Sequence, residues 1–244
     1  MNVTAVCHVH SEWSYDADWP LRRLAAEFAR RGYRVVLSTE HDKGFSEQRF
    51  QQYRATCAEV SSQDLLVVPG IEYSDSTNVV HILTWGLSRF LGERLPTLEL
   101  LERVKAENGV AVMAHPVRRD AWKRYDSSWT GYLTGIELWN RKADGWAPSP
   151  IAAKLLDGTV LLPFASLDFH RQNQMFPLSM HLNIGGAITE QTVVNSLRLH
   201  DCHAMAFSAP AEKYLTGWRR PTLHLTERMR RTAAPFYHWV KRSR

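Results

Sequence analysis

Short apolar runs alternate along the chain with segments in which apolar residues recur at helical spacing. Around Leu21, Leu24 and Phe28 such a segment predicts a helix over residues 19–33, and similar segments predict helices over 46–60, 98–108, 148–156 and 189–199. The apolar runs predict seven strands, over residues 2–7, 34–39, 64–70, 78–86, 110–115, 134–140 and 159–166. Strands separated by helices are typical of a parallel α/β fold. Residues 180–184 suggest an eighth strand.

Composition adds little to this picture. The chain has 244 residues, of which 44% are hydrophobic, and this length allows one barrel-sized domain or two small ones. We expect a single domain over residues 1–212. No apolar run approaches the ~20 residues that a membrane span needs. The three cysteines lack metal-type spacing and the first histidine pair leaves no room for a signal peptide, so we expect a cytoplasmic protein.

The positive charge lies at the C-terminus. Residues 213–244 contain nine Lys or Arg and one acidic residue, a net charge of +8, which leaves −3 for residues 1–212 out of the total of +5. We expect this stretch to be a basic extension that is partly helical. In two earlier helices, we expect Thr97 and Thr189 to be the N-cap residues. Such an extension suits RNA, DNA or an anionic membrane surface, but we favour a solvated helix with a frayed end.

Metal-binding residue types recur where the predicted strands end. Six of the eleven histidines fall within or just after strands, and acidic residues accompany them. Because the carboxyl ends of parallel strands meet on one face of an α/β barrel, these side chains can converge although 160 positions separate them. His8 and His10 can also share a face, since residues two apart in a strand point the same way. The histidines are His8, His10, His41, His81, His115 and His170, and the accompanying acids are Glu40, Glu72 and Asp168.

This set of side chains indicates the chemistry. Imidazoles and carboxylates without thiolates suit Zn²⁺, Mn²⁺ or Fe²⁺ with open water positions. Six histidines with three or four carboxylates are too many for one ion, whereas two or three divalent ions sharing a bridging carboxylate would use them all. Such clusters lower the pKa of a bound water and clamp phosphate or carbonyl oxygens.

In their order, these motifs resemble the PHP (polymerase and histidinol phosphatase) family over roughly residues 3–171. The motifs are an HxH pair, an acid six residues later, an acid–His pair, GxE, a mid-chain His, His-Pro and a final SxDxH. Here they read His8-Val9-His10, Asp16, Glu40-His41, Gly70-Ile71-Glu72, His81, His115-Pro116 and Ser166-Leu167-Asp168-Phe169-His170. The resemblance implies a distorted (β/α)₇ barrel, similar to a TIM barrel, with a trinuclear metal site at the C-terminal strand ends.

The resemblance also implies which residues hold each ion. His8, His10, Glu72 and Asp168 would hold the first, Glu72 would bridge to a second held by His81 and His115, and Asp16, His41 and His170 would hold a third. Two positions depart from the family pattern. Glu40 stands where Asp is common and is expected to orient an imidazole. The last motif is one residue longer than its shortest form, which would either shift Asp168 by one place or present it on a bulge.

The implied activity is hydrolysis of a phosphoester by a metal-bridging hydroxide. Asp168 or His170 would protonate the leaving oxygen. Glu137 and Asn140 are expected to support the ligands or contact substrate. Cations that follow the motifs are candidates for binding phosphate, and about two of them are expected to touch it: Lys43, Arg118, Arg119, Arg141 and Arg171.

Three functions remain open at this point. The first is a phosphatase of small phosphorylated molecules, which we favour. The second is a phosphodiesterase or nuclease that acts on nucleotides or single-stranded nucleic acid, for which the basic extension and the tryptophans would provide contacts. The third is a non-catalytic binding module, against which the intact set of nine candidate ligands argues.

Overall fold

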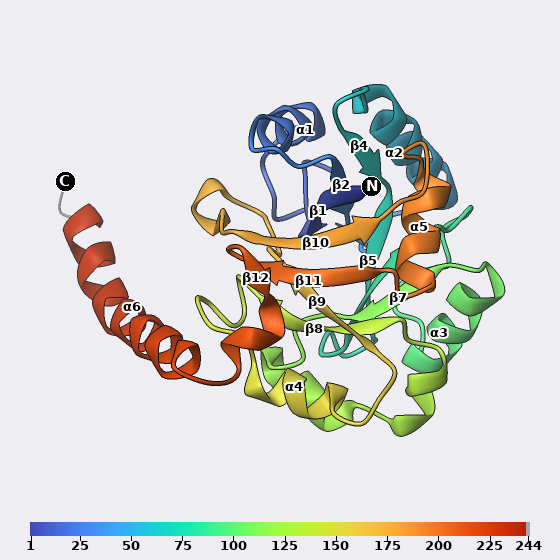
Figure 1. The fold of residues 1–244 in the computed structure, drawn as a ribbon. Helices are drawn as coiled ribbons and strands as arrows, with labels where there is room; N and C mark the ends of the chain where they lie inside the picture. Colours follow the sequence, from blue (N-terminus) through green and yellow to red (C-terminus); the bar gives the residue numbers. More distant parts are fainter. Residues whose placement is uncertain (243–244) are drawn as a thin grey trace.

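Two six-stranded sheets form the centre of the protein in the computed structural model, which describes the backbone of residues 1–242 and the side chains of residues 1–232 (Figure 1). The first sheet has the order β12-β11-β10-β1-β2-β4, and the second has the order β3-β5-β6-β7-β8-β9. Their bounds are β1 (Asn2–Val9), β2 (Val35–Ser38), β3 (Glu40–His41), β4 (Leu66–Val68), β5 (Gly70–Ser74), β6 (His81–Trp85), β7 (Val110–Met113), β8 (Gly135–Asn140), β9 (Leu162–Ser166), β10 (Leu178–Asn183), β11 (Cys202–Ala206) and β12 (Ala209–Pro210).

Helices pack outside these sheets. Helices α1 to α5 surround the strands, whereas α6 extends away from them (Figure 1). The predicted apolar face of α1 is buried, and the side chains of Ser46 and Thr189 cap α2 and α5 as N-caps. The helices are α1 (Leu21–Arg30), α2 (Glu47–Val60), α3 (Thr97–Ala106), α4 (Pro150–Leu156), α5 (Glu190–Arg198) and α6 (Arg219–Arg242), with short 3₁₀ segments at Arg118–Arg124, Ser127–Gly131, Gln172–Gln174 and Ala211–Tyr214.

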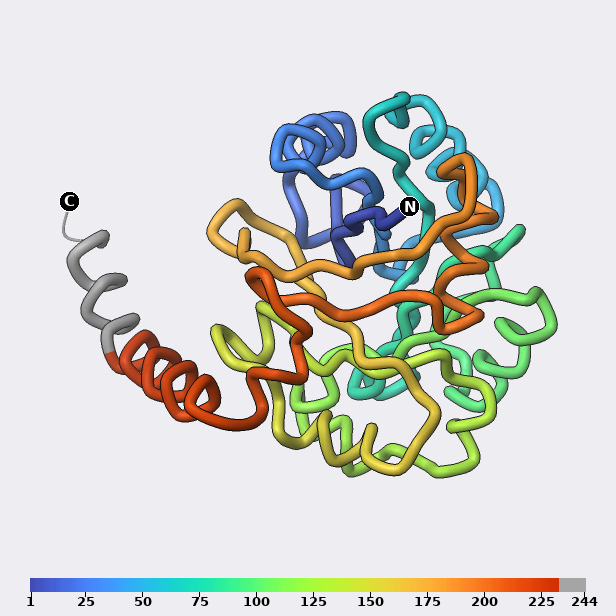
Figure 2. The backbone as a smooth tube through the Cα atoms, viewed as in Figure 1, coloured from blue at the N-terminus to red at the C-terminus, as the bar shows by residue number. Residues whose placement is uncertain are grey.

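The two sheets are joined along both sides. Single residues, Thr39 and Pro69, separate β2 from β3 and β4 from β5, so the chain passes twice from one sheet directly into the other. On the opposite side, the main-chain N–H groups of Leu167 and Phe169 donate to the carbonyls of Cys7 and His8 at 3.0 Å each. These bonds hold the end of β9 against β1, which pairs with β2 on one side and with the much later strand β10 on the other (Figure 2).

The predicted α/β class is confirmed, but three details differ. The described strands form two sheets and no single closed barrel. Residues 70–74 form an additional strand, β5, so Glu72 lies within a strand and does not follow one. Thr97 is the first residue of α3 and makes no N-cap bond, because Pro96 occupies that position.

The strands are also less uniformly parallel than predicted. Strand β6 runs antiparallel to both β5 and β7, and β10 to β12 form antiparallel pairs at the end of the first sheet. The connection between β5 and β6 is too short for a crossover helix, and it is a turn in which the Asp75 carboxylate accepts bonds from the N–H groups of Val79 and Val80. As a result His81, the first residue of β6, pairs with Ser74, the last residue of β5.

No helix within the described residues is both long and apolar enough to span a membrane.

Gly70 lies where the chain crosses between the sheets, and its lack of a side chain is required there. A Cβ at this position would clash with the carbonyl oxygens of Ser38 and Thr84. We expect Gly70→Ala to lower the free energy of unfolding by about 2–3 kcal/mol, measured by urea denaturation. Gly131→Ala is the matched control, because nothing lies within 4 Å of its added Cβ. Equal stability of the two variants would contradict this account of the crossing.

Candidate metal centre

The structure brings all nine predicted ligand residues into one cluster. His8 and His10 come from the end of β1, His41 from β3, Glu72 from β5 and His81 from the start of β6, while the others lie in loops. Because β6 is reversed, its first residue reaches the same edge as the last residues of its neighbours. Eight of the nine are buried, and the Asp16 side chain is 35% exposed. The loop residues are Asp16, His115, Asp168 and His170.

The Glu72 carboxylate is the centre of the cluster. Its Oε2 lies 3.3 Å from the Nε2 atoms of both His8 and His10. The same oxygen is 3.1 Å from Nδ1 of His41. Its Oε1 lies 2.6 Å from Nδ1 of His81 and 2.9 Å from Nε2 of His115. One buried carboxylate therefore contacts five imidazoles from four different parts of the chain.

Two further carboxylates complete the cluster. Asp168 Oδ1 lies 3.8 Å from the Nε2 atoms of His8 and His10 and 3.3 Å from Nδ1 of His170. Asp16 bridges the two histidines on the outer side, with 3.3 Å from Oδ1 to His41 Nε2 and 3.2 Å from Oδ2 to His170 Nε2. Asp16 thus lies with His41 and His170, as the resemblance implies.

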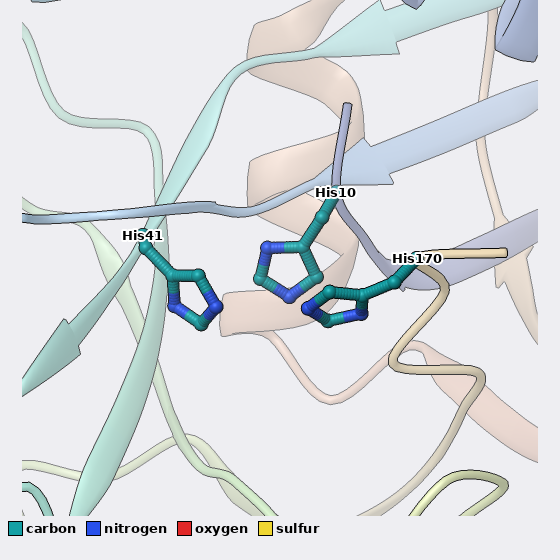
Figure 3. A group of neighbouring side chains, drawn as sticks. All are labelled: His10, His41 and His170. Atoms are coloured by element: carbon teal, nitrogen blue, oxygen red, sulfur yellow. The ribbon is translucent and has the colours of Figure 1, made fainter. Parts of the chain in front are cut away.

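Three groups of side chains have ligand atoms within 4.8 Å of one another, the spacing that a single metal ion requires. In one of them the ring of His10 lies between those of His41 and His170, with ring centroids 4.4 and 4.1 Å away (Figure 3). The groups are His10, His41 and His170; His8, Glu72 and His115; and His8, His10 and Asp168.

Several of these side chains depend on unusual backbone. His8, His115 and Asp168 have positive φ angles of 61°, 25° and 50°, a region that few residues other than glycine adopt. The pairing of β1 with β2 shifts register between Cys7 and Val9, so His8 occupies an irregularity and the strand does not alternate regularly there. The rings of His8 and His10 nevertheless lie 5.0 Å apart. Backbone strain of this kind is concentrated at functional sites.

The buried carboxylate of Glu137 orients two of the histidines. Its Oε1 accepts a hydrogen bond from Nδ1 of His8 at 2.7 Å, which leaves Nε2 of His8 directed at Glu72. Its Oε2 accepts from the main-chain N–H of His115 at 2.6 Å and from Nδ2 of Asn140 at 2.8 Å. Glu137 and Asn140 therefore lie where the sequence places supporting residues.

Glu40 is directed away from the centre. Its carboxylate accepts bonds from the N–H of Ser11 at 3.1 Å and from the hydroxyls of Ser11 and Ser14 at 2.6 and 2.5 Å. The Ser14 hydroxyl also lies 3.2 Å from Nδ1 of His10. Glu40 thus acts on the imidazole of His10 through Ser14, a residue for which the sequence offered no signal.

The charges of the cluster are strongly coupled. Burial alone would lower the pKa of His41, but the carboxylates of Glu72 and Asp16 outweigh it and raise that pKa to about 10. Burial would also lower the pKa of His8, but this pKa is raised by the carboxylates of Glu137, Asp168 and Glu72. Burial and the neighbouring His41 and His170 lower the pKa of His10. The histidines in turn outweigh burial and lower the pKa values of Asp16, Glu72 and Asp168.

The cluster meets the requirements of a divalent metal site. The Nε2 atoms of His8, His10 and His41 are buried, and although a carboxylate oxygen lies 3.3 Å from each, no described residue forms a hydrogen bond of suitable geometry with them. Buried polar atoms are normally hydrogen-bonded, so these nitrogens need another partner. Imidazoles directed at carboxylates, with no thiolate among them, form the donor set that Zn²⁺, Mn²⁺ and Fe²⁺ accept.

The predicted phosphate-binding cations are divided between the centre and its surroundings. Arg118 reaches the centre, with Nη1 3.1 Å from Nε2 of His81. Arg119 donates instead to the carbonyl of Asn78, and Arg141 lies 5.2 Å from the ring of Phe176. Lys43 lies 4.9 Å from the ring of Tyr15, and the side chain of Arg171 is exposed.

Sequence reasoning missed Lys142, whose Nζ lies 3.1 Å from Oδ1 of Asp168 and 3.2 Å from Nε2 of His170. It directly follows Arg141, which was predicted in its place. The sequence predicts a cation in the loop after β8. Only the conformation of this turn decides that Lys142, and not the adjacent Arg141, faces the metal centre.

Metal binding should release protons. His8 and His41 carry raised pKa values in the metal-free protein and must lose their protons to become ligands. We expect Zn²⁺ or Mn²⁺ added to metal-free protein at pH 7.5 to release about two protons per chain, measured with a pH indicator. His200→Gln, outside the cluster, should behave like the wild type. Binding without proton release would show that these imidazoles are already neutral.

Comparison with known proteins gives structural matches only. No family model matches the sequence, and no curated protein matches it. A two-domain protein from Bacteroides vulgatus, described as containing a predicted PHP-like metal-dependent phosphoesterase, is 17% identical with a TM-score of 0.65 and matches 84% of this chain. PsfC from Pseudomonas syringae is 15% identical with a TM-score of 0.62, over 96% of this chain and 99% of PsfC. The lesion-specific endonuclease Q from Pyrococcus furiosus is 15% identical with a TM-score of 0.60, over 81% of this chain.

The chain spans only part of two of these proteins, 65% of the Bacteroides protein and 56% of endonuclease Q. At such low identity the likeness is one of fold. The family resemblance drawn from the motifs is therefore confirmed at that level: this chain has the fold of the PHP-like metal-dependent phosphoesterases.

Proposed function

We propose that this protein is a metal-dependent phosphoesterase that hydrolyses small phosphomonoesters. The observation that carries the proposal is the contact of one buried carboxylate, Glu72, with five imidazoles at the ends of the strands. The family resemblance of the motifs and the shared fold support it.

The nine clustered residues would hold two or three divalent ions of Zn, Mn or Fe. His8, His10, Glu72 and Asp168 would form one site, Glu72 with His81 and His115 a second, and Asp16 with His41 and His170 a third. Divalent ions in such sites supply a nucleophilic water of lowered pKa and neutralise charge on phosphate oxygens.

The protein's own residues have separate tasks in this reaction. The ammonium of Lys142 and the guanidinium of Arg118 line the central cavity and would bind the non-bridging oxygens of the phosphate. Asp168 or His170, both within 3.5 Å of Lys142, would pass a proton from a water molecule to the leaving oxygen. Glu137 keeps His8 and the main chain of His115 in place throughout.

Cavity size supports a compact substrate. The cavity at the centre has a volume of about 40 Å³, and Tyr15, Arg118 and Lys142 are among the residues that line it. A terminal phosphate group enters such a space more readily than a phosphate within a polymer, which has a substituent on both sides.

A phosphodiesterase or nuclease is the alternative, and one surface feature favours it. The indole of Trp218 is 71% exposed and lies 5.1 Å from the guanidinium of Arg219, at the start of the basic helix α6. Exposed aromatic rings beside arginine suit the bases and backbone of single-stranded nucleic acid. Endonuclease Q, one of the structural matches, is described in complex with a 27-mer duplex that has an abasic lesion at its active site.

We also propose that residues 1–212 form one domain, in which strands of both sheets are arranged in the manner of an open, distorted barrel, with residues 213–244 as an extension. The extension contacts the domain, since the Glu227 carboxylate accepts a bond from the N–H of Trp146 at 2.9 Å. A cytoplasmic location stays a prediction from the cysteines.

A substrate panel tests the proposed activity. With Mn²⁺ present, we expect release of phosphate from small phosphomonoesters at a kcat/KM at least about tenfold above that for bis-p-nitrophenyl phosphate or single-stranded oligonucleotides. The physical reason is the small central cavity, which accommodates a terminal phosphate more readily than a phosphate with a second large substituent. A higher kcat/KM for the diester or the oligonucleotides would instead support a phosphodiesterase or nuclease.

Asp168→Asn tests the catalytic assignment. This change retains the shape of the side chain but removes its charge beside Lys142, and we expect kcat to fall about 10²- to 10³-fold. Asp64→Asn is the matched control, because Asp64 is exposed and lies outside the cluster, and this change should leave kcat unchanged. Full turnover by Asp168→Asn would refute the role given to this carboxylate.

A further inference from the structure

A second cavity, of about 190 Å³, adjoins the metal centre. Tyr15, His41 and His81 line both this cavity and the central one, so the two spaces share these walls. The second space, which we call the annex, is therefore close enough to receive the remaining part of a substrate whose phosphate lies at the centre.

The annex is lined almost entirely by polar groups from three loops. Acceptors and donors are interspersed there, with carboxylates and an amide beside hydroxyls, an ammonium and a guanidinium. Besides the shared walls, the residues are Asp42, Lys43, Ser74, Asp75, Ser76, Thr77, Asn78, Glu93 and Arg94.

Part of this lining forms a rigid frame. The Asp42 carboxylate accepts bonds from the N–H and hydroxyl of Ser74 at 3.3 and 3.0 Å and from the N–H of Arg94 at 3.3 Å. The Asp75 carboxylate holds the turn before β6 through the N–H of Val79 at 2.8 Å. The cavity is thus held in shape by the protein before any ligand enters.

Other groups are available to a ligand. Among the described side chains, no carboxylate lies within 4.0 Å of the Lys43 ammonium, which instead sits 4.9 Å from the centroid of the Tyr15 ring. The Tyr15 residue is 65% exposed, yet its ring is stacked on His41 at 5.1 Å with an interplanar angle of 25°. An aromatic ring that is held in place and still exposed offers a flat surface against which a ligand can pack.

We propose that the annex is the leaving-group subsite and that it takes a hydroxylated group of carbohydrate type, packed against Tyr15 and hydrogen-bonded by Lys43. This inference rests on the proposed phosphomonoesterase activity and names its substrate class, the phosphates of sugars and polyols. Hydroxyls both donate and accept, so they can satisfy a lining of mixed polarity, whereas an apolar leaving group would leave these polar groups unpaired.

The test compares ribose 5-phosphate, whose sugar reaches the annex, with methyl phosphate, whose leaving group is too small to do so. We expect Tyr15→Ala to lower the ratio of kcat/KM for ribose 5-phosphate over methyl phosphate about tenfold in the Mn²⁺-loaded protein. Tyr15→Phe, which keeps the ring, should hold this ratio within about twofold of the wild type.

Lys43→Met provides a second, independent variant, expected to lower the same ratio about fivefold. Its matched control is Lys105→Met, because the Lys105 ammonium also lies 4.9 Å from a tyrosine ring, that of Tyr132, away from the annex. Lys105→Met should leave the ratio unchanged. If Tyr15→Ala and Lys43→Met turn over both substrates with the wild-type ratio, the annex proposal is wrong while the phosphomonoesterase stands.

Binding measurements separate this inference from the proposed function. If the protein releases phosphate from neither substrate, the proposed activity fails, and calorimetric titration then tests the annex by itself. Tighter binding of ribose 5-phosphate than of methyl phosphate, weakened about tenfold by Tyr15→Ala, would support the annex. Equal affinity for the two compounds would overturn it.

Discussion

A single buried carboxylate constrains the whole structure. Burying the charge of Glu72 costs several kcal/mol, and only close partners can offset this. Five imidazoles supply them, at distances of 2.6–3.3 Å from its oxygens. Since these imidazoles come from β1, β3, β6 and the loop after β7, four distant parts of the chain must be positioned to within a few tenths of an ångström. The register of both sheets is compatible with this convergence.

Irregular features of the fold serve this convergence. Reversal of β6 delivers His81 from the start of a strand, and positive φ angles turn His8, His115 and Asp168 into the cluster. Positive φ angles cost stability, and three of the ten described non-glycine residues that adopt them are candidate ligands. Regular strands alone would place some of these side chains in the core, where an imidazole has no partner.

The surroundings of the cluster differ in chemistry from one side to the other. Glu137 and Glu40 support it from within through buried hydrogen bonds, whereas Lys142 and Arg118 bring positive charge to the central cavity. Beyond Tyr15 the annex offers a polar space of defined shape. Under the proposed function, different loops around one opening would recognise the phosphate and the rest of the substrate, so that substrate choice could vary without altering the candidate metal ligands.

The sequence by itself determined the α/β class, most strand positions and the nine residues that converge, because hydrophobic periodicity and the spacing of motifs are local properties. It also placed Glu137 and Asn140 beside the candidate ligands, as residues that support them or contact substrate. The tertiary structure alone decided the direction of β6, the separation into two sheets, the choice of Lys142 over Arg141, and the joint wall that Tyr15 forms between the centre and the annex. These depend on which segments meet in space, and contacts between residues far apart in the chain leave no pattern in either segment.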